Sequence, residues 1–391
     1  MEVESKNVLI ISPFFFPELI STGKFNTDIA ISLKNRGHKV VVLCSHPLYP
    51  NWIPEESHEK IKGIKIIRGG LNINYTKKPL VRRLILELWF TLFLFKNILK
   101  YRNKVDIVIP VYPPSLAFFF NLIFLNKKVK KVGMVHDLQE VYSQGKKGVF
   151  NKIISFFINK VEGATFRKCD KLIFLAEEMK DTAKSFYNLD ESKLLVQYPF
   201  STMKMENITN DLEETLPREK IHIVYSGALG EKQNPEGILH FFEYASNILK
   251  NVNFHFFSQG QIFDMMKNKN RNTFIKFHDL VPRDNIEELY SRSDIQLIPQ
   301  LSGTSKGSLP SKLPNILASG CKTLFITDPD SEIEKLFHKY KLEKVVSSWD
   351  NEVLITALIS LLKENDNEIS LKHKRVSREL FSLDSMIKKI I

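Results

Sequence analysis

The sequence predicts an α/β protein with two doubly wound parallel sheets in tandem, and three observations lead to this fold. Short, continuous apolar runs alternate with helical stretches, which is the pattern of parallel strands covered by helices on both faces. This alternation stops in a polar, turn-rich stretch over residues 188–220 and then starts again. A chain of 391 residues also exceeds one ordinary core. We therefore expect two Rossmann-like domains, residues 1–195 and 196–369.

Each expected element follows from its local pattern. The apolar runs expected to form strands are 7–12, 38–45, 65–70, 106–111, 131–137, 171–176, 221–227, 253–259, 274–279, 294–300, 322–328 and 344–348. Helices are expected between them, among them 27–36, which Gly37 closes, and 236–250. Residues 370–391 are expected to form a C-terminal helix that packs back onto the first domain.

The cysteines and the first residues indicate the compartment. Cys44, Cys169 and Cys321 lie far apart, without the spacing of a disulfide framework or of a zinc site. The first residues include two glutamates and lead directly into an apolar run, unlike a secretory signal peptide. We therefore expect a reduced, cytoplasmic protein that binds no metal.

The net charge of +12 is concentrated in the first half of the chain. Residues 1–190 hold 30 of the 56 basic residues but only 17 of the 44 acidic ones, so the remainder is close to neutral. Such an imbalance predicts an anionic partner, which could be nucleic acid, an acidic membrane surface or a phosphorylated ligand. No helix-turn-helix, zinc-finger or RNP-like pattern occurs, so we expect no nucleic acid partner.

Three segments of this half combine basic residues with aliphatic and phenylalanine-rich runs, namely 80–104, 116–131 and 146–168. In the first segment, Glu87 and Lys96 interrupt the apolar run, so it is too short to span a bilayer. Its basic ends suit a helix that lies on anionic lipid. A buried helix with solvated ends would give the same pattern, and the sequence alone leaves both interpretations open.

Four motifs follow predicted strands, at the edge where open α/β sheets bind ligands. After the first strand, Gly23 is expected just ahead of a helix, where backbone N–H groups and Lys24 would attract a phosphate. A flexible loop without a ligand is the alternative. The strand expected at 131–137 ends with His136 and Asp137. His136 could hydrogen-bond a substrate hydroxyl, or it could have a structural role.

The third motif, YSGALGEKQNPEG at 225–237, joins a strand, a glycine-rich turn and a helix. Gly227 and Gly230 would let the backbone approach an anion, and Lys232 and Gln233 could reach its oxygens. Because two glycines three positions apart also form ordinary turns, the motif indicates an anion site only in combination with the others.

The fourth motif, residues 302–320, leads through a Gly/Ser-rich run to a helix expected over 311–319. Lys312 lies in the first turn of this helix, where the helix dipole disfavours a cation by about 0.3–1 kcal/mol. A bound anion would reverse that effect, and an exposed lysine that tolerates it is the alternative.

Together the motifs resemble glycosyltransferase family 4, a retaining family with the GT-B fold, in which two Rossmann-like domains face each other across a cleft. Within the family, the sequence is most similar to colanic-acid-type fucosyltransferases and related polysaccharide enzymes. The matching stretches are PELISTGKFNTDIA, HPLYPNW, YSGALGEKQ and LPSKLPNILASG. They occur in this order along nearly the whole chain.

The resemblance implies roles for individual residues. Gly23, with Lys24 beside it, matches the glycine that lies against the donor phosphates, and His136 matches the histidine that contacts the donor sugar. The positions that match contacts to the diphosphate are Gly227, Gly230, Lys232 and Gln233. The residues that would present a helix N-terminus and a charge to the same group are Ser311, Lys312 and Leu313. The residues expected on the acceptor side are Tyr49, Trp52 and Asp137.

The sequence also departs from the family pattern. Many members carry two glutamates eight positions apart, and here the second position is Asn315, still a donor-binding candidate, while the first falls near Gly307. A common arginine is Ala228 here, and a usual lysine is Gln233. We expect Lys312 to supply the lost positive charge.

The resemblance implies retaining transfer from a nucleoside diphosphate sugar, with GDP-fucose the first candidate, to a lipid-linked saccharide in surface polysaccharide biosynthesis, for a capsule or exopolysaccharide. Cations and N–H groups would stabilise the leaving diphosphate, with His136 and Lys312 as catalytic candidates and no cofactor or metal. Such a protein would be peripheral to the inner face of the cell membrane. Two alternatives stay open. One is a catalytically silent subunit that supports a partner transferase, and the other is a sugar-nucleotide epimerase that uses Asp137 and Glu140.

Overall fold

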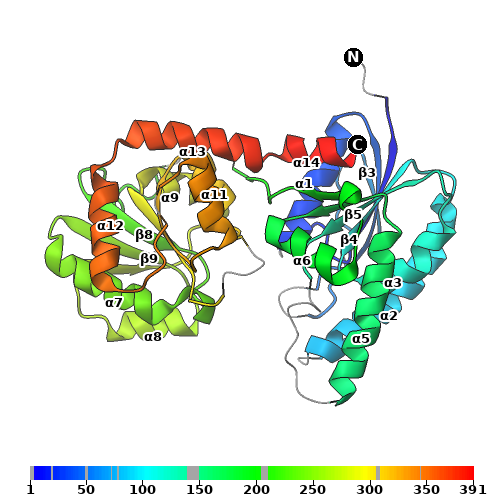
Figure 1. Ribbon diagram of the computed structural model, residues 1–391, viewed down its shortest axis with the longest axis horizontal. Coiled ribbons are helices and arrows are strands. Elements are labelled where there is room, and N and C mark those ends of the chain that lie inside the picture. The colour runs from blue at the N-terminus through cyan, green and yellow to red at the C-terminus, as the bar shows by residue number, and fades with distance from the viewer. Residues whose placement is uncertain are drawn as a thin grey trace. The chain divides into compact units, whose positions relative to one another are not determined.

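The computed structural model describes residues 4–18, 21–48, 52–71, 73–76, 79–138, 149–203, 210–304, 309–343 and 345–391. The chain divides into two compact units. Unit 1 is Met1–Tyr198 with Leu383–Ile391, and unit 2 is Pro199–Ser382. Each unit is built on one parallel sheet covered by helices (Figure 1). The α/β class with two Rossmann-like domains is thereby confirmed.

Unit 1 contains a seven-stranded sheet in the order β3-β2-β1-β4-β5-β6-β7, in which every neighbouring pair is parallel. The strands are β1 (Asn7–Ile11), β2 (Lys39–Ser45), β3 (Ile64–Gly69), β4 (Ile107–Tyr112), β5 (Lys130–Val135), β6 (Lys171–Phe174) and β7 (Leu194–Val196). The central strand β4 is buried at every position, which explains its unbroken apolar sequence. The short edge strand β7 was not expected from the sequence.

Helices cover both faces of this sheet. They are α1 (Ser21–Asn35), α2 (Pro79–Ile98), α3 (Ser115–Asn121), α5 (Val149–Arg167), α6 (Glu177–Tyr187) and α14 (Leu383–Ile390), with the 3-10 turns η1 (Leu99–Tyr101), η2 (Leu122–Phe124) and η3 (Glu191–Lys193). Right-handed crossovers place α1 on one face and α2, α3, α5 and α6 on the other (Figure 1). No helix in the described part of the chain is long and apolar enough to cross a membrane.

The last helix, α14, belongs to unit 1 and packs against α1. Lys389 donates to the carbonyl of Val196 (2.7 Å), and Lys130 donates to the carbonyl of Ile390 (3.0 Å). The single helix expected over 370–391 is corrected to two helices, because the chain breaks at Phe381 and the longer helix before it remains in unit 2.

Unit 2 contains a five-stranded parallel sheet in the order β10-β9-β8-β11-β12. The strands are β8 (Ile221–Ser226), β9 (Val252–Phe257), β10 (Ile275–His278), β11 (Ile295–Pro299) and β12 (Lys322–Ile326). The strand expected over 344–348 is corrected to a single bridge between Ile326 and Val346. Of the described residues 345–348, Val346 joins the sheet, donating to the carbonyl of Phe325 (2.8 Å) and accepting from the N–H of Thr327 (3.0 Å).

The helices of unit 2 also lie on both faces of its sheet. They are α7 (Pro235–Ile248), α8 (Gln261–Lys269), α9 (Ile286–Arg292), α10 (Leu313–Ser319), α11 (Glu332–Tyr340), α12 (Asn351–Lys363) and α13 (Asp366–Leu380), with the 3-10 turns η4 (Glu231–Gln233) and η5 (Arg283–Asn285). The crossovers through α7 and α8 run toward β10, whereas those through α9 and α10 run toward β12, so the two pairs cover opposite faces.

Three histidines form a hydrogen-bonded chain across β8, β9 and β10. His222 Nδ1 lies 2.9 Å from His255 Nε2, and His255 Nδ1 lies 3.0 Å from His278 Nε2. Because His222 Nε2 lies 2.8 Å from the carbonyl oxygen of Pro217, which can only accept, each ring must be neutral and donate through Nε2. Burial lowers the pKa of His255 to about 2 and that of His278 to about 4.

The row of three histidines makes the stability of unit 2 sensitive to acid. The folded-state pKa of His255 lies below its ordinary value, so the unfolded state binds the proton first and stability is lost as the pH falls below about 6.5. Each further pH unit costs up to about 1.4 kcal/mol. We expect His255→Gln to flatten the pH dependence of thermal unfolding between pH 7.5 and 5, whereas His240→Gln, at an exposed position of α7, leaves it steep. Equal slopes for the two variants would contradict this.

Candidate functional site

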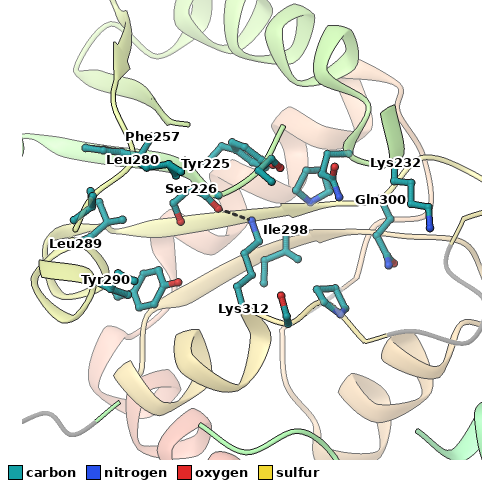
Figure 2. Close-up of a pocket in the computed structure, with 18 of the residues that line it drawn as sticks. Tyr225, Ser226, Lys232, Phe257, Leu280, Leu289, Tyr290, Ile298, Gln300 and Lys312 are labelled. Atoms are coloured by element: carbon teal, nitrogen blue, oxygen red, sulfur yellow. Dashed lines mark hydrogen bonds between the residues drawn. The ribbon is translucent and has the colours of Figure 1, made fainter. Parts of the chain in front are cut away.

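A cavity of about 320 Å³ opens at the carboxyl ends of β8 and β11 in unit 2. The chain runs from β8 to one side of the sheet and returns to β11 on the other, so the cavity lies at the topological switch point. The apolar residues of its lining include Phe257, Leu280, Val281, Ile286, Leu289 and Tyr290, and the polar ones are Ser226, Lys232, Gln233, Gln300, Ser311 and Lys312. Figure 2 shows Lys312 between an apolar side, with Phe257, Leu280, Leu289 and Tyr290, and a polar side, with Lys232 and Gln300.

The amino group of Lys312 is buried against the ends of two strands. It donates to the carbonyls of Ser226 in β8 and Leu297 in β11, both at 3.2 Å, and lies 4.5 Å from the centre of the Tyr225 ring (Figure 2). Burial lowers the pKa of Lys312 to about 7, and it is the only cause of the shift, because no charged group contributes. Among the described residues, carbonyl dipoles and a ring face surround this amino group, and no carboxylate contributes to its electrostatics.

Lys312 itself lies just ahead of α10, as its N-cap, and not in the first helical turn as expected. The N–H of Leu313 donates to the carbonyl of Pro310 (3.0 Å), so this donor is already occupied. Leu313 is fully buried in the core and does not line the cavity. Of the expected group 311–313, the structure thus brings Ser311 and Lys312 to the cavity.

The turn after β8 forms another wall of the cavity. Gly227 has φ +122°, a conformation that other residues rarely adopt, and its N–H donates to the carbonyl of Phe257 (2.9 Å). Gly230 lies outside the cavity lining, and its N–H donates to the Gln233 side chain at 3.0 Å, which closes η4. Lys232 is exposed and faces the cavity from the same turn.

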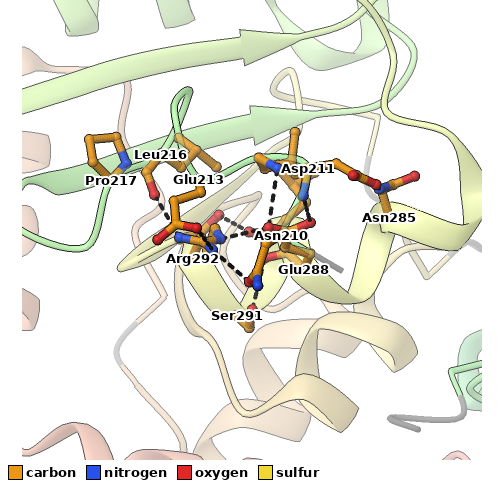
Figure 3. Close-up of polar contacts among 12 residues, drawn as sticks. Asn210, Asp211, Glu213, Leu216, Pro217, Asn285, Glu288, Ser291 and Arg292 are labelled. Atoms are coloured by element: carbon orange, nitrogen blue, oxygen red, sulfur yellow. Dashed lines mark hydrogen bonds and ion pairs between the residues drawn. The ribbon is translucent and has the colours of Figure 1, made fainter. Parts of the chain in front are cut away.

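The apolar side of the cavity depends on α9, which a buried ion pair fixes in place (Figure 3). Arg292 donates to Glu288 at 2.7 Å, and both side chains are almost fully buried. Glu288 also accepts the backbone N–H groups of Asp211 and Leu212, each at 3.1 Å, which ties the start of unit 2 to α9. The same helix presents Ile286, Leu289 and Tyr290 to the cavity.

In unit 1, the structure places Gly23 inside α1, because this helix begins at Ser21 and not at residue 27. A Cβ at Gly23 would lie 2.9 Å from Cβ of Glu18, so the glycine allows the preceding loop to pack closely on the helix. Gly23 is buried, and its carbonyl accepts from Thr27 at 2.7 Å. Lys24 follows in the same turn and is half-buried.

His136 directly follows β5 and is held by its neighbours. Its N–H donates to the carbonyl of Tyr112 (3.1 Å), and its ring packs edge-on against Phe25 with 5.0 Å between centres. Among the described residues, its buried Nε2 has no hydrogen-bond partner. Burial lowers the pKa of His136 to about 4, so the ring is neutral at pH 7. This nitrogen is available to a ligand oxygen.

Of the remaining expected residues of unit 1, the structure describes Trp52 and Asp137. Trp52 packs edge-on against Phe14, with 6.1 Å between centres, and the Arg82 guanidinium lies 3.8 Å from its ring. Asp137 is exposed, and Tyr49 lies outside the described residues, as does Glu140. In the part of the chain that the structure describes, no three His, Cys, Asp or Glu side chains are placed to hold a metal ion.

Comparison with known proteins identifies a family domain in the first half of the chain and the fold of the whole. Residues 22–200 match the model of Glycosyltransferase Family 4. The chain carries a Glycosyltransferase Family 4 domain and is a glycosyltransferase. A protein of Escherichia coli (strain K12), named colanic acid biosynthesis glycosyl transferase WcaI, is 23% identical to it over 400 residues, which cover 95% of this chain and 94% of the relative.

Solved structures give the same fold. The sucrose-phosphate synthase tll1590 of Thermosynechococcus elongatus matches with a TM-score of 0.70 and 13% identity, over 98% of this chain and 97% of the other. An E. coli structure described as trehalose-6-phosphate bound with UDP-2-fluoro glucose matches with a TM-score of 0.69 and 9% identity, over the same shares of both chains. The transferase therefore has the GT-B fold that the sequence resemblance implied.

The sequence analysis did not select the apolar side of the transferase cavity. Phe257, Leu280 and Val281 follow the ends of β9 and β10, so the strand-end rule that selected Gly227 would also have found them. Tyr290 belongs to α9 and carries no such signal. Only the fold brings it to the cavity.

Asn315 also lies away from the cavity and has a structural contact of its own. Its side-chain oxygen accepts from the N–H of Thr202 (2.9 Å) and from the hydroxyl of Ser201 (3.0 Å). In the described structure, Asn315 therefore connects the first residues of unit 2 to α10 by hydrogen bonds.

We expect Asn315→Ala to lower the free energy of unfolding of the transferase by about 1–3 kcal/mol, because its three side-chain hydrogen bonds are lost in a partly buried place. Nucleotide affinity, measured by calorimetry, should change less than twofold because Asn315 does not line the cavity. A large loss of affinity at unchanged stability would instead assign Asn315 to the donor.

Proposed function

We propose that this transferase moves a sugar from a nucleoside diphosphate sugar, held in the unit 2 cavity, to a lipid-linked saccharide in surface polysaccharide biosynthesis. The observation that carries the donor part is Lys312, a buried lysine at the switch point of the sheet that has no carboxylate partner in the described part of the chain. Such a cation favours an anionic ligand, because a diphosphate would supply the counter-charge that the protein does not.

The two sides of the cavity suit the two parts of this donor. A nucleoside fits the apolar side, where Phe257, Leu289 and Tyr290 offer aromatic and aliphatic surface. The diphosphate then lies beside Lys312, with Lys232 and the turn at Gly227 within the same wall. Figure 2 shows Lys232 and Gln300 on the side of Lys312 that is opposite to Phe257 and Leu280.

Lys312 would act chiefly when the sugar–phosphate bond breaks. Negative charge then develops on the leaving diphosphate, and a fixed ammonium group in a water-poor site stabilises that charge without reorganisation. In the free protein the pKa of Lys312 is about 7, and a bound diphosphate raises it and keeps the group charged. On this proposal no metal or other cofactor takes part.

His136 is proposed to contact the donor sugar. Its neutral ring presents a buried Nε2 without a partner among the described residues, which suits a hydrogen bond with a sugar hydroxyl. By the family resemblance, we propose that Gly23 and Lys24 lie near the donor phosphates. Trp52 and Asp137 are proposed to lie on the acceptor side. The configuration of the sugar is proposed to be retained, with the acceptor attacking on the leaving-group side.

The acceptor and the donor sugar are proposals from similarity. The relative named for colanic acid biosynthesis favours a surface polysaccharide, such as a capsule or exopolysaccharide, and GDP-fucose as the first donor to try. The similar structure with UDP-2-fluoro glucose favours a nucleotide sugar in general. A lipid-linked acceptor would place the enzyme at the inner face of the cell membrane as a peripheral protein.

A thermal-shift panel of UDP-, GDP-, ADP- and CMP-sugars tests the donor proposal. We expect one nucleotide class to raise the melting temperature and Lys312→Met to weaken its affinity at least tenfold, because the diphosphate loses its buried cation. Lys335→Met, at an exposed position of α11, is the matched control and should bind normally. The proposal fails if no sugar nucleotide stabilises the unmodified protein.

The pH dependence of donor binding is a second test. Because Lys312 loses its proton above a pKa of about 7, affinity for the nucleoside diphosphate should fall as the pH rises from 7 to 9, by up to about tenfold per unit. Lys312→Arg should remove this dependence, since a guanidinium stays charged. Calorimetric titrations at pH 7, 8 and 9 measure it, and a flat profile for the unmodified protein would exclude Lys312 as the titrating group.

A further inference from the structure

The helix α2 and the turn η1 that follows it expose a continuous apolar stripe in unit 1. Its members recur at intervals of three or four residues, so they share one face of the helix. They are Val81, Leu84, Leu88, Leu92, Phe95 and Leu99. Leu88 and Leu92 are 60% and 65% exposed, which is unusual for two large apolar side chains one turn apart.

The stripe continues onto the neighbouring helix. The rings of Phe95 in α2 and Phe124 in η2 meet edge-on with 5.4 Å between centres, and beside this contact Phe120 and Ile123 are 49% and 59% exposed. The next helix, α5, packs on α3 and exposes Phe156 and Phe157 (Figure 1). We call the exposed apolar side chains of α2–η1 and α3–η2 the apolar face.

Buried carboxylates hold these helices together, so the apolar face is a fixed surface. Glu87 in α2 accepts the N–H groups of Ser115 and Leu116 at 3.1 and 3.0 Å, which caps the start of α3. Glu162 in α5 accepts from the Ser115 hydroxyl at 3.0 Å. The helices therefore cannot turn their exposed apolar residues inward without losing these bonds.

The charges around the apolar face have one sign. The only acidic residues in 79–104, 115–131 and 149–168 are Glu87 and Glu162, and both are buried. The basic residues exposed beside the apolar side chains are Lys96, Lys100, Lys127, Lys128 and Lys160. Within these three segments, the apolar surface is bordered by lysines and has no exposed carboxylate, which makes it complementary to an interface with apolar chains below negative head groups.

We propose that the apolar face is a docking surface for an anionic lipid bilayer. The stripe of α2 would enter the head-group region, with Lys96 and Lys100 at the phosphates. The inference builds on the proposed lipid-linked acceptor, because it supplies the contact that brings the enzyme to such a substrate. A second copy of the chain fits less well, since a symmetric contact would bring the same lysines of both copies together.

Co-sedimentation with vesicles tests this inference on the full-length protein. We expect binding to phosphatidylcholine vesicles that contain 30% phosphatidylglycerol and at least tenfold weaker binding for Leu88→Gln/Leu92→Gln. Leu371→Gln, at a leucine of α13 in unit 2 that is 68% exposed, is the matched control and should bind normally. Lys96→Gln/Lys100→Gln should weaken binding several-fold at low salt and have less effect at high salt.

The nucleotide thermal shift of the same variants separates this inference from the donor proposal. The docking surface is supported if Leu88→Gln/Leu92→Gln loses vesicle binding but keeps the nucleotide shift, because the fold and the donor cavity are then intact. It is overturned if this variant binds vesicles normally or if the unmodified protein ignores anionic vesicles. It is also overturned if sedimentation without lipid shows a dimer that Leu88→Gln/Leu92→Gln dissociates. None of these outcomes depends on whether a sugar nucleotide binds.

Discussion

The donor side of this protein depends on one interaction, the contact of a buried lysine with the carboxyl ends of two strands. Lys312 reaches the carbonyls of Ser226 and Leu297 because α10 begins only at Leu313 and leaves the lysine free to turn under β8 and β11. Desolvation of its ammonium group opposes folding, as its lowered pKa shows. Lys312 lowers the stability of the empty protein and also lines its cavity. Such a residue is best explained by an anionic ligand that compensates for the lost hydration of the ammonium group.

The surroundings of this lysine are built to stay in place. Buried carboxylates make neighbouring segments rigid in both units by accepting backbone N–H groups, as Glu288 does for residues 211 and 212 and Glu87 does for the first turn of α3. Since each carboxylate satisfies donors that would otherwise be buried without partners, it binds separate segments at modest net cost. The cavity wall formed by α9 is therefore set by contacts that lie away from the cavity itself.

The sequence predicted the sheets well and the details of the site less well, for identifiable reasons. Buried parallel strands such as β4 have unbroken apolar runs, so local pattern suffices to find them. β7 has only three residues, and the segment around Val346 pairs through one bridge, so neither differs locally from a loop. Leu313 matches the family motif, but its burial in the core depends on tertiary packing, which the motif does not reveal.

The basic first half now has a more specific physical explanation than its net charge suggested. Unit 1 places Glu87 and Glu162 inside, where they join helices, while several lysines of the same segments are exposed, namely Lys96, Lys100, Lys127, Lys128 and Lys160. The surface of unit 1 is consequently more basic than its overall composition. The excess positive charge lies beside exposed leucines and phenylalanines. A soluble nucleotide requires charge in a concave site, whereas charge around an exposed apolar stripe suits an extended anionic surface. We therefore propose different places for the two anionic partners inferred from one charge count: unit 2 for a diphosphate and unit 1 for lipid.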